Sequence, residues 1–422
     1  MTVSLVTNIS RPISSALSQA FAMDTVGKLD AYGKLGAWST QSLFKASEQG
    51  VFFDPSDLST MFQDATGTTP VTADGQPVGL ILDKSKGLVL GSTLNSNSSF
   101  DSGMSSWSAM ANGTVDTSVS GQVTVSQTST GATTFSYQAI TTTVGKSYKC
   151  TFVAKGVSGN VELFIGVLDG SSKVDLPDVD TGQPQTVSLI FTASTTNPEL
   201  RFGLSAYNTS GAVVTLYSAT IQELLGNHAS QATAAARPLY KTDGTYHWLQ
   251  FDGVDDSLST AAIDFTGTDK MSVFAGVYRN GNGVIVETGV NRTGVGAFGV
   301  RAITSELDSG FNINGFGYKE STNLPDAPQT EVVYAPFDGA LFGYTGIGTI
   351  RVNGSNTTMT PGSGAGNSSA GYFGNHQLRV GSYSGGGYFN GNTYPLIVVG
   401  KQCAPEEIDQ TEAWVNGKTG AF

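Results

Sequence analysis

The stretch that decides the fold is discontinuous in the sequence. It begins as GVFFDPSDLSTMFQD at residues 50–64 and continues as VGLILDKSKG at residues 78–87. Its sequel, GNHASQAT, comes only at residues 226–233, and Arg237-Pro238 follows soon after. The residues in between have the pattern of a complete β-domain. The sequence therefore predicts one domain that is split by the insertion of another.

The composition favours an all-β protein with more than one domain. The chain has 422 residues, of which 39% are hydrophobic, 13% are charged and 53 are Gly. This length is enough for two or three cores, and many turn formers with few helical patterns are typical of β-structure. The formal net charge of −12 repels phosphate backbones, so we expect no nucleic-acid binding.

The sequence shows no pattern typical of a membrane span, a secretion signal or a disulfide framework. No apolar run is long enough to span a membrane, so we expect no membrane insertion. The first residues lack the basic and apolar pattern of a secretion signal, which predicts synthesis in a cytoplasm. The two cysteines, Cys150 and Cys403, fall in different predicted domains. We therefore expect two buried thiols and no disulfide framework.

Three segments follow from the pattern along the chain. Residues 1–48 have a loose apolar spacing that fits either an attachment segment, which docks onto a partner or a neighbouring subunit, or an ordinary extension packed on its own domain. Residues 94–225 carry about eight short strands between turn signals, which predicts a jelly-roll sandwich. Residues 49–93 plus 226–422 form the discontinuous domain, a second sandwich. In the latter, only Pro405 to Asn416 looks helical, with Asn416-Gly417 as its stop.

Four pieces of the discontinuous domain carry a family resemblance. They are DPSDLST (54–60), GNHASQA (226–232) with Arg237-Pro238, FDGVDD (251–256), and YPLIVV (394–399) followed by GKTG (417–420). This set resembles the concanavalin A-like, laminin-G-type lectin sandwich of phage and prophage structural proteins. In that family the first piece leads almost directly to the second, so residues 83–87 and 226–229 look like the two halves of an interrupted join.

The resemblance implies a role on a virus particle. It implies a fibre, spike or decoration subunit on the virion surface, made in the host cytoplasm. Such a subunit attaches to other virion proteins through its N-terminal segment and forms a homo-oligomer, for which a trimer is the expected form.

The inserted segment carries a second resemblance. LNSNSSFDSG at residues 94–103, with Trp107, is similar to the opening of carbohydrate-binding modules of the galactose-binding-like jelly-roll type. Such modules often hold a structural calcium ion with this opening and an acidic residue in the last strand. The last strand here, LYSATI at residues 216–221, has no Asp or Glu, so that inherited site lacks its carboxylate.

The sequence contains no recognisable catalytic motif. His228, His247 and His376 have no metal-type spacing, and His228 in the join fits a hydrogen-bonded structural role. Glu306-Leu307-Asp308 starts like the paired carboxylates of one glycosidase type but lacks the second Glu. No nucleophile elbow, phosphate loop or dinucleotide fingerprint appears in a strand-to-helix context. We therefore expect no catalytic residues, no enzyme activity and no organic cofactor.

An acidic turn is the candidate metal site. Asp252, Asp255 and Asp256 lie within five residues of one another. The cluster fits either a plain surface turn or a turn that binds a structural Ca²⁺, since calcium prefers several oxygen ligands.

Aromatic side chains in polar surroundings are the candidate sugar-binding residues. An aromatic ring offers an apolar face and a polar edge, which suits stacking on saccharides. The alternative is that these rings belong to the cores or to subunit contacts. The candidates are Trp107, Tyr137, Tyr207, Tyr318, Tyr383 and Tyr388.

These observations predict an adhesion protein. Weak contacts to a host-surface polysaccharide would be multiplied by the number of copies on the particle. Two alternatives remain, namely an architectural capsid or tail decoration protein without glycan binding, and a polysaccharide-degrading enzyme favoured only by analogy of fold.

Overall fold

The computed structural model describes the chain from residue 38 to residue 422 with several gaps. The gaps are residues 45–47, 129–130, 158–161, 171, 176–181, 209–210, 290–295, 306–307, 316–317, 323, 340–349, 358, 362–370 and 385. Side chains are also outside the description at 172–175, 304–305, 308–315, 318–322 and 359–361. Most of the predicted attachment segment, residues 1–48, thus lies outside the described residues.

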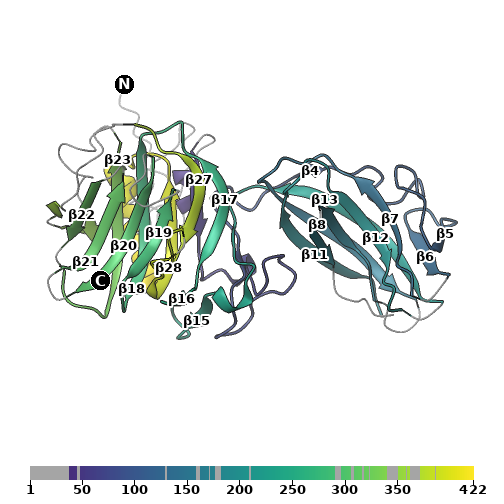
Figure 1. Ribbon diagram of the computed structural model, residues 1–422, viewed down its shortest axis with the longest axis horizontal. Coiled ribbons are helices and arrows are strands. Elements are labelled where there is room, and N and C mark those ends of the chain that lie inside the picture. Colours follow the sequence, from purple (N-terminus) through teal and green to yellow (C-terminus); the bar gives the residue numbers. More distant parts are fainter. Residues whose placement is uncertain are drawn as a thin grey trace, which may run out of the picture.

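The fold consists of two β-sandwiches side by side, which confirms the all-β fold class (Figure 1). We call them the inserted sandwich, built from residues 90–224, and the larger sandwich, built from the strands before and after it. Cys150 and Cys403 are free and buried, as expected. Among the described helices, none is long and apolar enough to cross a membrane.

The larger sandwich packs two antiparallel sheets face to face. One sheet has the order β15 (Leu239–Thr242), β16 (His247–Asp252), β28 (Asn390–Val399), β18 (Lys270–Arg279), β23 (Gln329–Asp338), β24 (Arg351–Val352) and β25 (Ser355–Asn356), with β1 (Gly50–Phe53) also on β28. The other has the order β2 (Met61–Phe62), β3 (Leu80–Ile81), β14 (Ala229–Ser230), β17 (Leu258–Asp264), β27 (Asn375–Val380), β19 (Gly283–Thr288), β20 (Phe298–Ser305), β21 (Asp308–Gly315), β22 (Tyr318–Thr322) and β26 (Met359–Pro361). Both sheets contribute buried apolar side chains to one core.

Strands from the two ends of the split pair with each other. Leu80 lies opposite Ser230 and Ile81 opposite Ala229, while β1 pairs with the second half of β28. The two halves of the interrupted join meet at Asp83. Its carboxylate accepts hydrogen bonds from Phe52 N (2.7 Å), Ser85 N (2.8 Å), Ser85 Oγ (2.7 Å) and Asn227 N (2.7 Å).

His228 completes this join as a structural residue. Its Nδ1 accepts a hydrogen bond from Asp83 N at 2.9 Å. Burial lowers the pKa of His228 and the charge of Asp83 opposes that shift, so the ring stays neutral as an acceptor. The hydrogen-bonded structural role expected for this histidine is what the contacts describe.

The inserted sandwich has its own two sheets and its own core. The first has the order β11 (Gln185–Thr192), β8 (Ser147–Gly156), β13 (Val213–Leu224), β6 (Val123–Gln127) and β5 (Gly113–Asp116), with β4 (Leu90–Thr93) on β13. The second has the order β10 (Ser172–Asp175), β9 (Gly166–Asp169), β12 (Glu199–Leu204) and β7 (Thr134–Ala139). Burial alternates along β6 and β8, as it does in strands with one face on a core.

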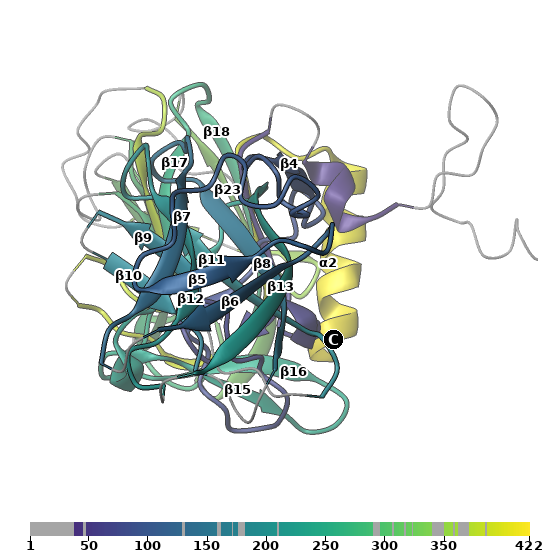
Figure 2. The ribbon, with the colours of Figure 1, turned by 90° about the vertical axis from the view of Figure 1, so that its right-hand side faces the viewer.

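In the described part of the larger sandwich, one long helix and three short 3₁₀ turns complete the fold. The turns are η1 (Thr40–Leu43), η2 (Leu58–Thr60) and η3 (Ala234–Ala236). The helix α2 (Pro405–Thr419) covers the outer face of the sheet that holds β18, β23 and β28 (Figure 2). The helix continues three residues past the predicted end at Asn416, so Gly417 lies inside it and does not stop it. The left-handed cap is Gly420, which has a φ of 63°.

The two sandwiches touch through a small apolar cluster. Leu80 and Leu82 of the larger sandwich pack with Ile190 and Leu224 of the inserted one. Beside this cluster, Ile190 N donates a 2.7 Å hydrogen bond to the carbonyl oxygen of Thr66. The loop that carries Thr66 is therefore the docking loop between the two bodies.

Asp64 organises this docking loop. Its carboxylate accepts hydrogen bonds from Thr66 N, Thr66 Oγ1, Thr68 N, Thr68 Oγ1 and Thr69 N at 2.5 to 3.1 Å. Burial by itself would raise the pKa of Asp64, but these hydrogen bonds outweigh it and lower the pKa to about 2.

Replacing Asp64 should destabilise the protein near neutral pH and much less in acid. The folded-state pKa lies below the unfolded value of 3.8, so the stabilising contribution is present above 3.8 and is lost as the pH falls through about 2. We expect Asp64→Ala to lower the free energy of unfolding by about 1 to 3 kcal/mol at neutral pH. Urea titrations of both proteins at decreasing pH check this, and a difference that stays constant down to the acid limit would contradict it.

Candidate functional site

The acidic turn joins β16 to β17 at one end of the larger sandwich. Asp252 Oδ1 accepts hydrogen bonds from Val254 N (2.7 Å) and Asp255 N (3.4 Å), so its side chain shapes the turn. Gly253 has a φ of +81°, and a Cβ at this position would lie 2.8 Å from the Cβ of Asn390. The turn therefore needs Asp at its start and Gly after it.

Three carboxylates converge in this turn, as the sequence spacing suggests. Oxygen atoms of Asp252, Asp255 and Asp256 lie within 4.8 Å of one another. Asp252 and Asp255 reach solvent, whereas Asp256 is buried and accepts a 3.0 Å hydrogen bond from Asp252 N. In the described part of the chain, no other cluster of three or more His, Cys, Asp or Glu side chains could hold a metal ion.

The electrostatics of the turn suit a bound cation. Burial raises the pKa of Asp256 to about 6, and the charges of Asp252 and Asp255 add to this rise, while the hydrogen bond from Asp252 N opposes it. Among the described residues, no Lys or Arg forms an ion pair with any of the three. Three carboxylates without a protein counter-charge are a ligand set that fits Ca²⁺.

A loop rich in Gly and Tyr lies directly against the acidic turn. This loop, residues 381–390, follows β27 and leads into β28. A Cβ at Gly381, where φ is +83°, would lie 3.1 Å from the carbonyl oxygen of Asp256 and would clash with the Phe251 ring. Asn390, the last residue of the loop, is the strand partner of Asp252. Two features from distant parts of the sequence thus form one surface.

Tyr383 and Tyr388 belong to this loop and are both half-buried. Tyr383 and Gly386 exchange two backbone hydrogen bonds of 2.9 and 3.2 Å, which closes a tight turn. A side chain at Gly387 would collide with the Tyr383 ring, so the ring lies over glycine backbone. Phe389 is fully buried against Phe251, with ring centroids 6.2 Å apart, and anchors the loop in the core.

The neighbouring turn after β18 supports the same end of the sandwich. Gly281 N donates a 2.7 Å hydrogen bond to the carbonyl oxygen of Asn390, and Asn280 Nδ2 donates to Asn390 Oδ1 at 3.1 Å. Val284 N donates to the carbonyl oxygen of Gly387 at 2.8 Å. These bonds link the loop 381–390 to the turn after β18 and so hold the loop in place beside the acidic turn.

Trp107 is a correction to the set of candidate sugar-binding residues. Its side chain is only 7% exposed and lies in the core of the inserted sandwich. The ring packs against Phe100 and Phe202, with centroids 5.7 and 4.8 Å away. Because protein covers its faces, Trp107 is a core residue and offers no surface for a sugar.

The other aromatic candidates are scattered. Tyr207 is 87% exposed after β12, and Tyr137 is 38% exposed on β7, where Arg201 is its strand partner. Tyr318 begins β22, but its side chain lies outside the described residues. Among the candidates whose side chains the structure describes, only Tyr383 and Tyr388 belong to the loop that contacts the acidic turn.

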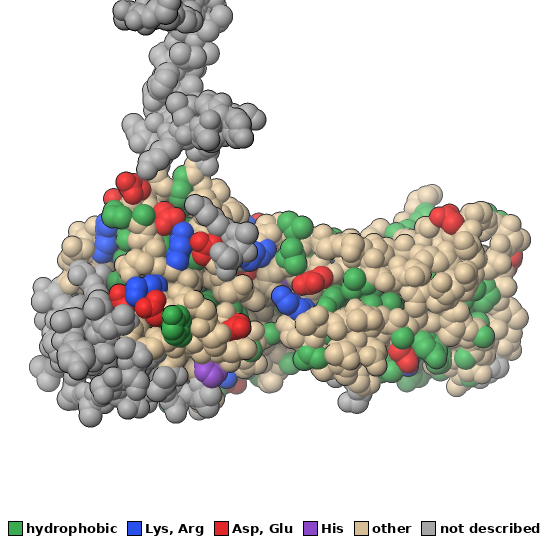
Figure 3. Space-filling view, turned by 90° about the horizontal axis from the view of Figure 1, so that it is seen from above, with side chains coloured by type: hydrophobic (Ala, Val, Ile, Leu, Met, Phe, Trp, Pro, Cys, Tyr) green, Lys and Arg blue, Asp and Glu red, His purple; other side chains and the backbone are tan. Residues whose placement is uncertain are grey.

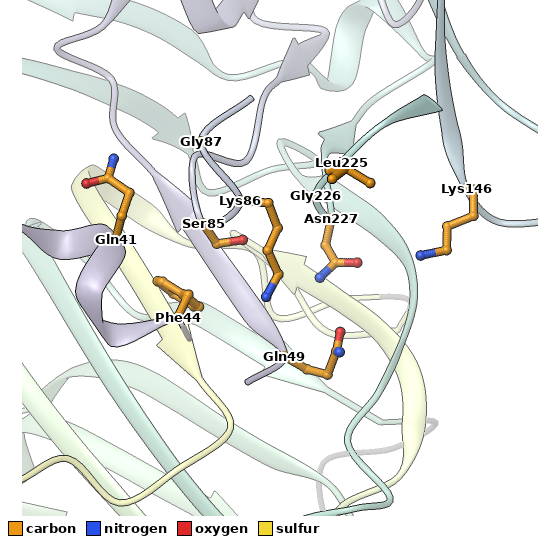
Figure 4. Close-up of a pocket in the computed structure, with 10 residues that line it drawn as sticks. All are labelled: Gln41, Phe44, Gln49, Ser85, Lys86, Gly87, Lys146, Leu225, Gly226 and Asn227. Atoms are coloured by element: carbon orange, nitrogen blue, oxygen red, sulfur yellow. The ribbon is translucent and has the colours of Figure 1, made fainter. Parts of the chain in front are cut away.

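A groove at the junction of the sandwiches was missed in the sequence. Figure 4 shows its smaller part, a cavity of about 550 Å³ that includes Lys86, Asn227 and Lys146 in its lining. Lys86 and Asn227 belong to the two halves of the interrupted join, and this is the sequence feature that could have placed them close together. Lys146 lies in an ordinary turn of the insert, and nothing in the sequence places it opposite Lys86.

Comparisons with known proteins give only distant likenesses. No protein-family model matches the sequence, and no curated protein matches it. Among solved structures, the chain is similar to the CBM22-1–CBM22-2 tandem domain of Paenibacillus barcinonensis Xyn10C, with 11% identity, 73% of this chain and 98% of that chain covered, and a TM-score of 0.30.

Two enzymes show likenesses of the same order. For Trypanosoma rangeli sialidase in complex with the inhibitor DANA, the identity is 10%, the coverage is 72% of this chain and 62% of that chain, and the TM-score is 0.32. For truncated AlyQ, with CBM32 and alginate lyase domains, the identity is 9%, the coverage is 78% of this chain and 98% of that chain, and the TM-score is 0.21. At these scores the likenesses carry no argument about function, which has to come from the site itself.

Proposed function

We propose that this protein is a glycan-binding adhesion protein, and that the saccharide binds where the acidic turn meets the loop 381–390. The observation that supports it is the contact between these two features, since one offers carboxylates for a cation and the other offers tyrosine rings. Sugar recognition commonly needs both a polar anchor and an apolar ring face. The role is binding without catalysis.

The carboxylates of Asp252, Asp255 and Asp256 would hold a Ca²⁺ ion. The ion would neutralise the charge of the turn and supply coordination positions for sugar hydroxyl groups. Tyr383, which lies over glycine backbone, would offer ring surface to the saccharide. Asn390, hydrogen-bonded to the turn after β18 and the strand partner of Asp252, positions the loop and does not itself need to touch the sugar.

The biological setting we propose is a virus particle. Its support is the resemblance of the larger sandwich to phage and prophage structural proteins. In this setting the chain is a fibre, spike or decoration subunit on the virion surface, joined to other virion proteins through its N-terminal segment. Copies in a homo-oligomer would turn weak contacts with host-surface polysaccharide into firm attachment.

Removing the Tyr383 ring should weaken glycan binding by about fivefold, because a stacked ring contributes on the order of 1 kcal/mol. The measurement is an array of bacterial capsule and cell-wall polysaccharides, probed with biotinylated protein that is tetramerised on streptavidin, in calcium and in EDTA. We expect binding in calcium that is lost in EDTA and reduced for Tyr383→Ala.

Tyr372→Ala is the matched control. Tyr372 is 61% exposed and precedes β27, whereas Tyr383 follows that strand, so the two tyrosines mark opposite ends of the sandwich. The control should bind like the wild type. If Tyr372→Ala and Tyr383→Ala weaken binding equally, or if no polysaccharide is retained at all, the proposed site is wrong.

A further inference from the structure

The junction of the two sandwiches contains a continuous groove with walls from both bodies. A cavity of about 1050 Å³ adjoins the cavity of about 550 Å³, and the two share Gln49, Lys146 and Asn227 in their linings. One wall of the larger cavity is formed by β14, β17 and the start of β27. The facing wall is the turn 144–146 and the end of β11, so neither sandwich forms the groove alone.

The spacing of these walls is set by direct contacts. A Cβ at Gly145 of the inserted sandwich would lie 4.0 Å from the Cβ of Ala261 on β17. On the other side, Ile190 N donates to the carbonyl oxygen of Thr66, and the apolar cluster around Leu80 and Ile190 closes the junction. A groove whose walls are held in this way is pre-organised, which lowers the entropic cost of binding a ligand.

Uncommitted amide and hydroxyl groups line the larger cavity. Within the described part of the chain, the side chains of Gln49, Ser230, Ser259 and Asn375 have no hydrogen-bond partner in the protein. Such groups both donate and accept, which suits a ligand with many hydroxyl groups. Val144, Ala261 and Ala262 add apolar surface between them.

Two lysines give the smaller cavity a positive charge. Figure 4 shows the side chains of Lys86 and Lys146 on opposite sides of Asn227. Lys86 Nζ donates to the neutral carbonyl oxygen of Glu48 at 2.8 Å. Lys146 is 58% exposed and lies 3.8 Å from Glu223, a pair that water weakens.

This charge stands out in an acidic chain. The net charge is −12, yet none of the described residues that line the smaller cavity is acidic. Figure 3 shows charges of both signs on the larger sandwich and few on the visible face of the inserted one. A locally positive recess on a negative protein attracts an anionic ligand.

We propose that this groove is a second binding site, for an oligosaccharide that carries carboxylate groups. A carboxylate lies between Lys86 and Lys146, and the following sugar rings place their hydroxyl groups on the amides and hydroxyls of the larger cavity. The choice of a saccharide rests on the proposed function, but the groove shares no lining residue with the acidic turn or the loop 381–390.

Calorimetric titration in EDTA tests this site while the calcium-dependent site is silent. The ligands are tetramers of galacturonic acid and of hyaluronan, together with the methyl esters of both, which remove the charge and keep the hydroxyl groups. We expect at least one acid to bind and its ester to bind at least about tenfold more weakly. An ester that binds as tightly as its acid, or no binding of either acid, overturns the proposal.

Three variants locate the binding. Lys86→Ala and Lys146→Glu should each raise the Kd for the acid by about tenfold or more, and Lys155→Ala, on β8 outside both cavities, should leave it unchanged. Lys146→Glu changes an exposed side chain and keeps the test valid if Lys86→Ala does not fold. Wild-type affinity in Lys146→Glu overturns the assignment.

The two sites can fail separately. Tyr383→Ala should leave the titration in EDTA unchanged, and Lys146→Glu should leave calcium-dependent binding on the polysaccharide array unchanged. Loss of the titration signal in Tyr383→Ala would overturn the groove as a separate site. Calcium-dependent binding with no titration signal would overturn the groove and leave the proposed function standing.

Discussion

Calcium should raise the midpoint temperature of thermal unfolding more at about pH 7.5 than at about pH 5. Burial raises the pKa of Asp256 to about 6, so its carboxylate is mostly charged at the higher pH and mostly protonated at the lower one. A protonated Asp256 removes one of the three oxygen ligands that we assign to the ion. At a calcium concentration about 100 times the Kd, binding would stabilise the folded protein by about 2.7 kcal/mol.

Without calcium, Asp256 makes the folded protein less stable as the pH rises, whereas the stabilisation by calcium increases with pH. Its folded-state pKa lies above the unfolded value of 3.8, so the proton stabilises the folded state. That contribution is fully present below 3.8 and is lost as the pH rises through about 6. The calcium-free protein should therefore gain stability when Asp256→Asn removes the charge at about pH 7.5, and should gain little in acid.

Scanning calorimetry with calcium and with EDTA checks both statements. Asp255→Asn removes a partly exposed carboxylate and keeps the hydrogen bond between Asp252 and Asp256, so it should lose the calcium response while remaining folded. Asp264→Asn, at the end of β17, is the control and should keep the response. A calcium-dependent shift of equal size in Asp255→Asn and in the wild type would place the ion elsewhere.

Replacing Trp107 with Ala should destabilise the inserted sandwich by about 3 to 5 kcal/mol, the usual cost of removing a buried aromatic ring. The ring fills the space between Phe100 and Phe202, and its Nε1 donates a 3.4 Å hydrogen bond to the carbonyl oxygen of Asn97. Truncation would therefore leave a cavity beside the opening of the module. Guanidinium unfolding followed by circular dichroism measures the loss.

Tyr207→Ala provides the comparison for this prediction. Tyr207 is 87% exposed, so its truncation should change the free energy of unfolding by no more than about 0.5 kcal/mol. Glycan binding at the loop 381–390 should survive in both variants once they are folded. A Trp107→Ala protein with wild-type stability would show that the ring is not part of the core.

The motifs of the larger sandwich were predictable because each one satisfies a local need. Asp252 and Gly253 are dictated by the turn, and the join around Asp83 and His228 is a network of short-range and cross-strand hydrogen bonds. The three carboxylates could be foreseen as a cluster because they lie in one turn. Residues that are close in the sequence within one turn are also close in space.

The remaining features depend on long-range packing. Trp107 lies among polar residues in the sequence, and only the position of Phe202 on β12 shows that the ring points inward. The contact between the acidic turn and the loop 381–390 follows from the pairing of β16 with β28, which no local pattern reveals. The groove depends on how two sandwiches dock through Thr66 and Ile190, and so carries no motif at all.

Hydrogen–deuterium exchange is the most direct test of the claim that the acidic turn and the loop 381–390 form one glycan site. The protein is compared in calcium with and without a polysaccharide that the array retains. The claim predicts slower exchange in both residues 252–257 and residues 381–390, with loss of both effects in Asp255→Asn. Protection confined to the inserted sandwich, or protection of one segment without the other, would contradict it.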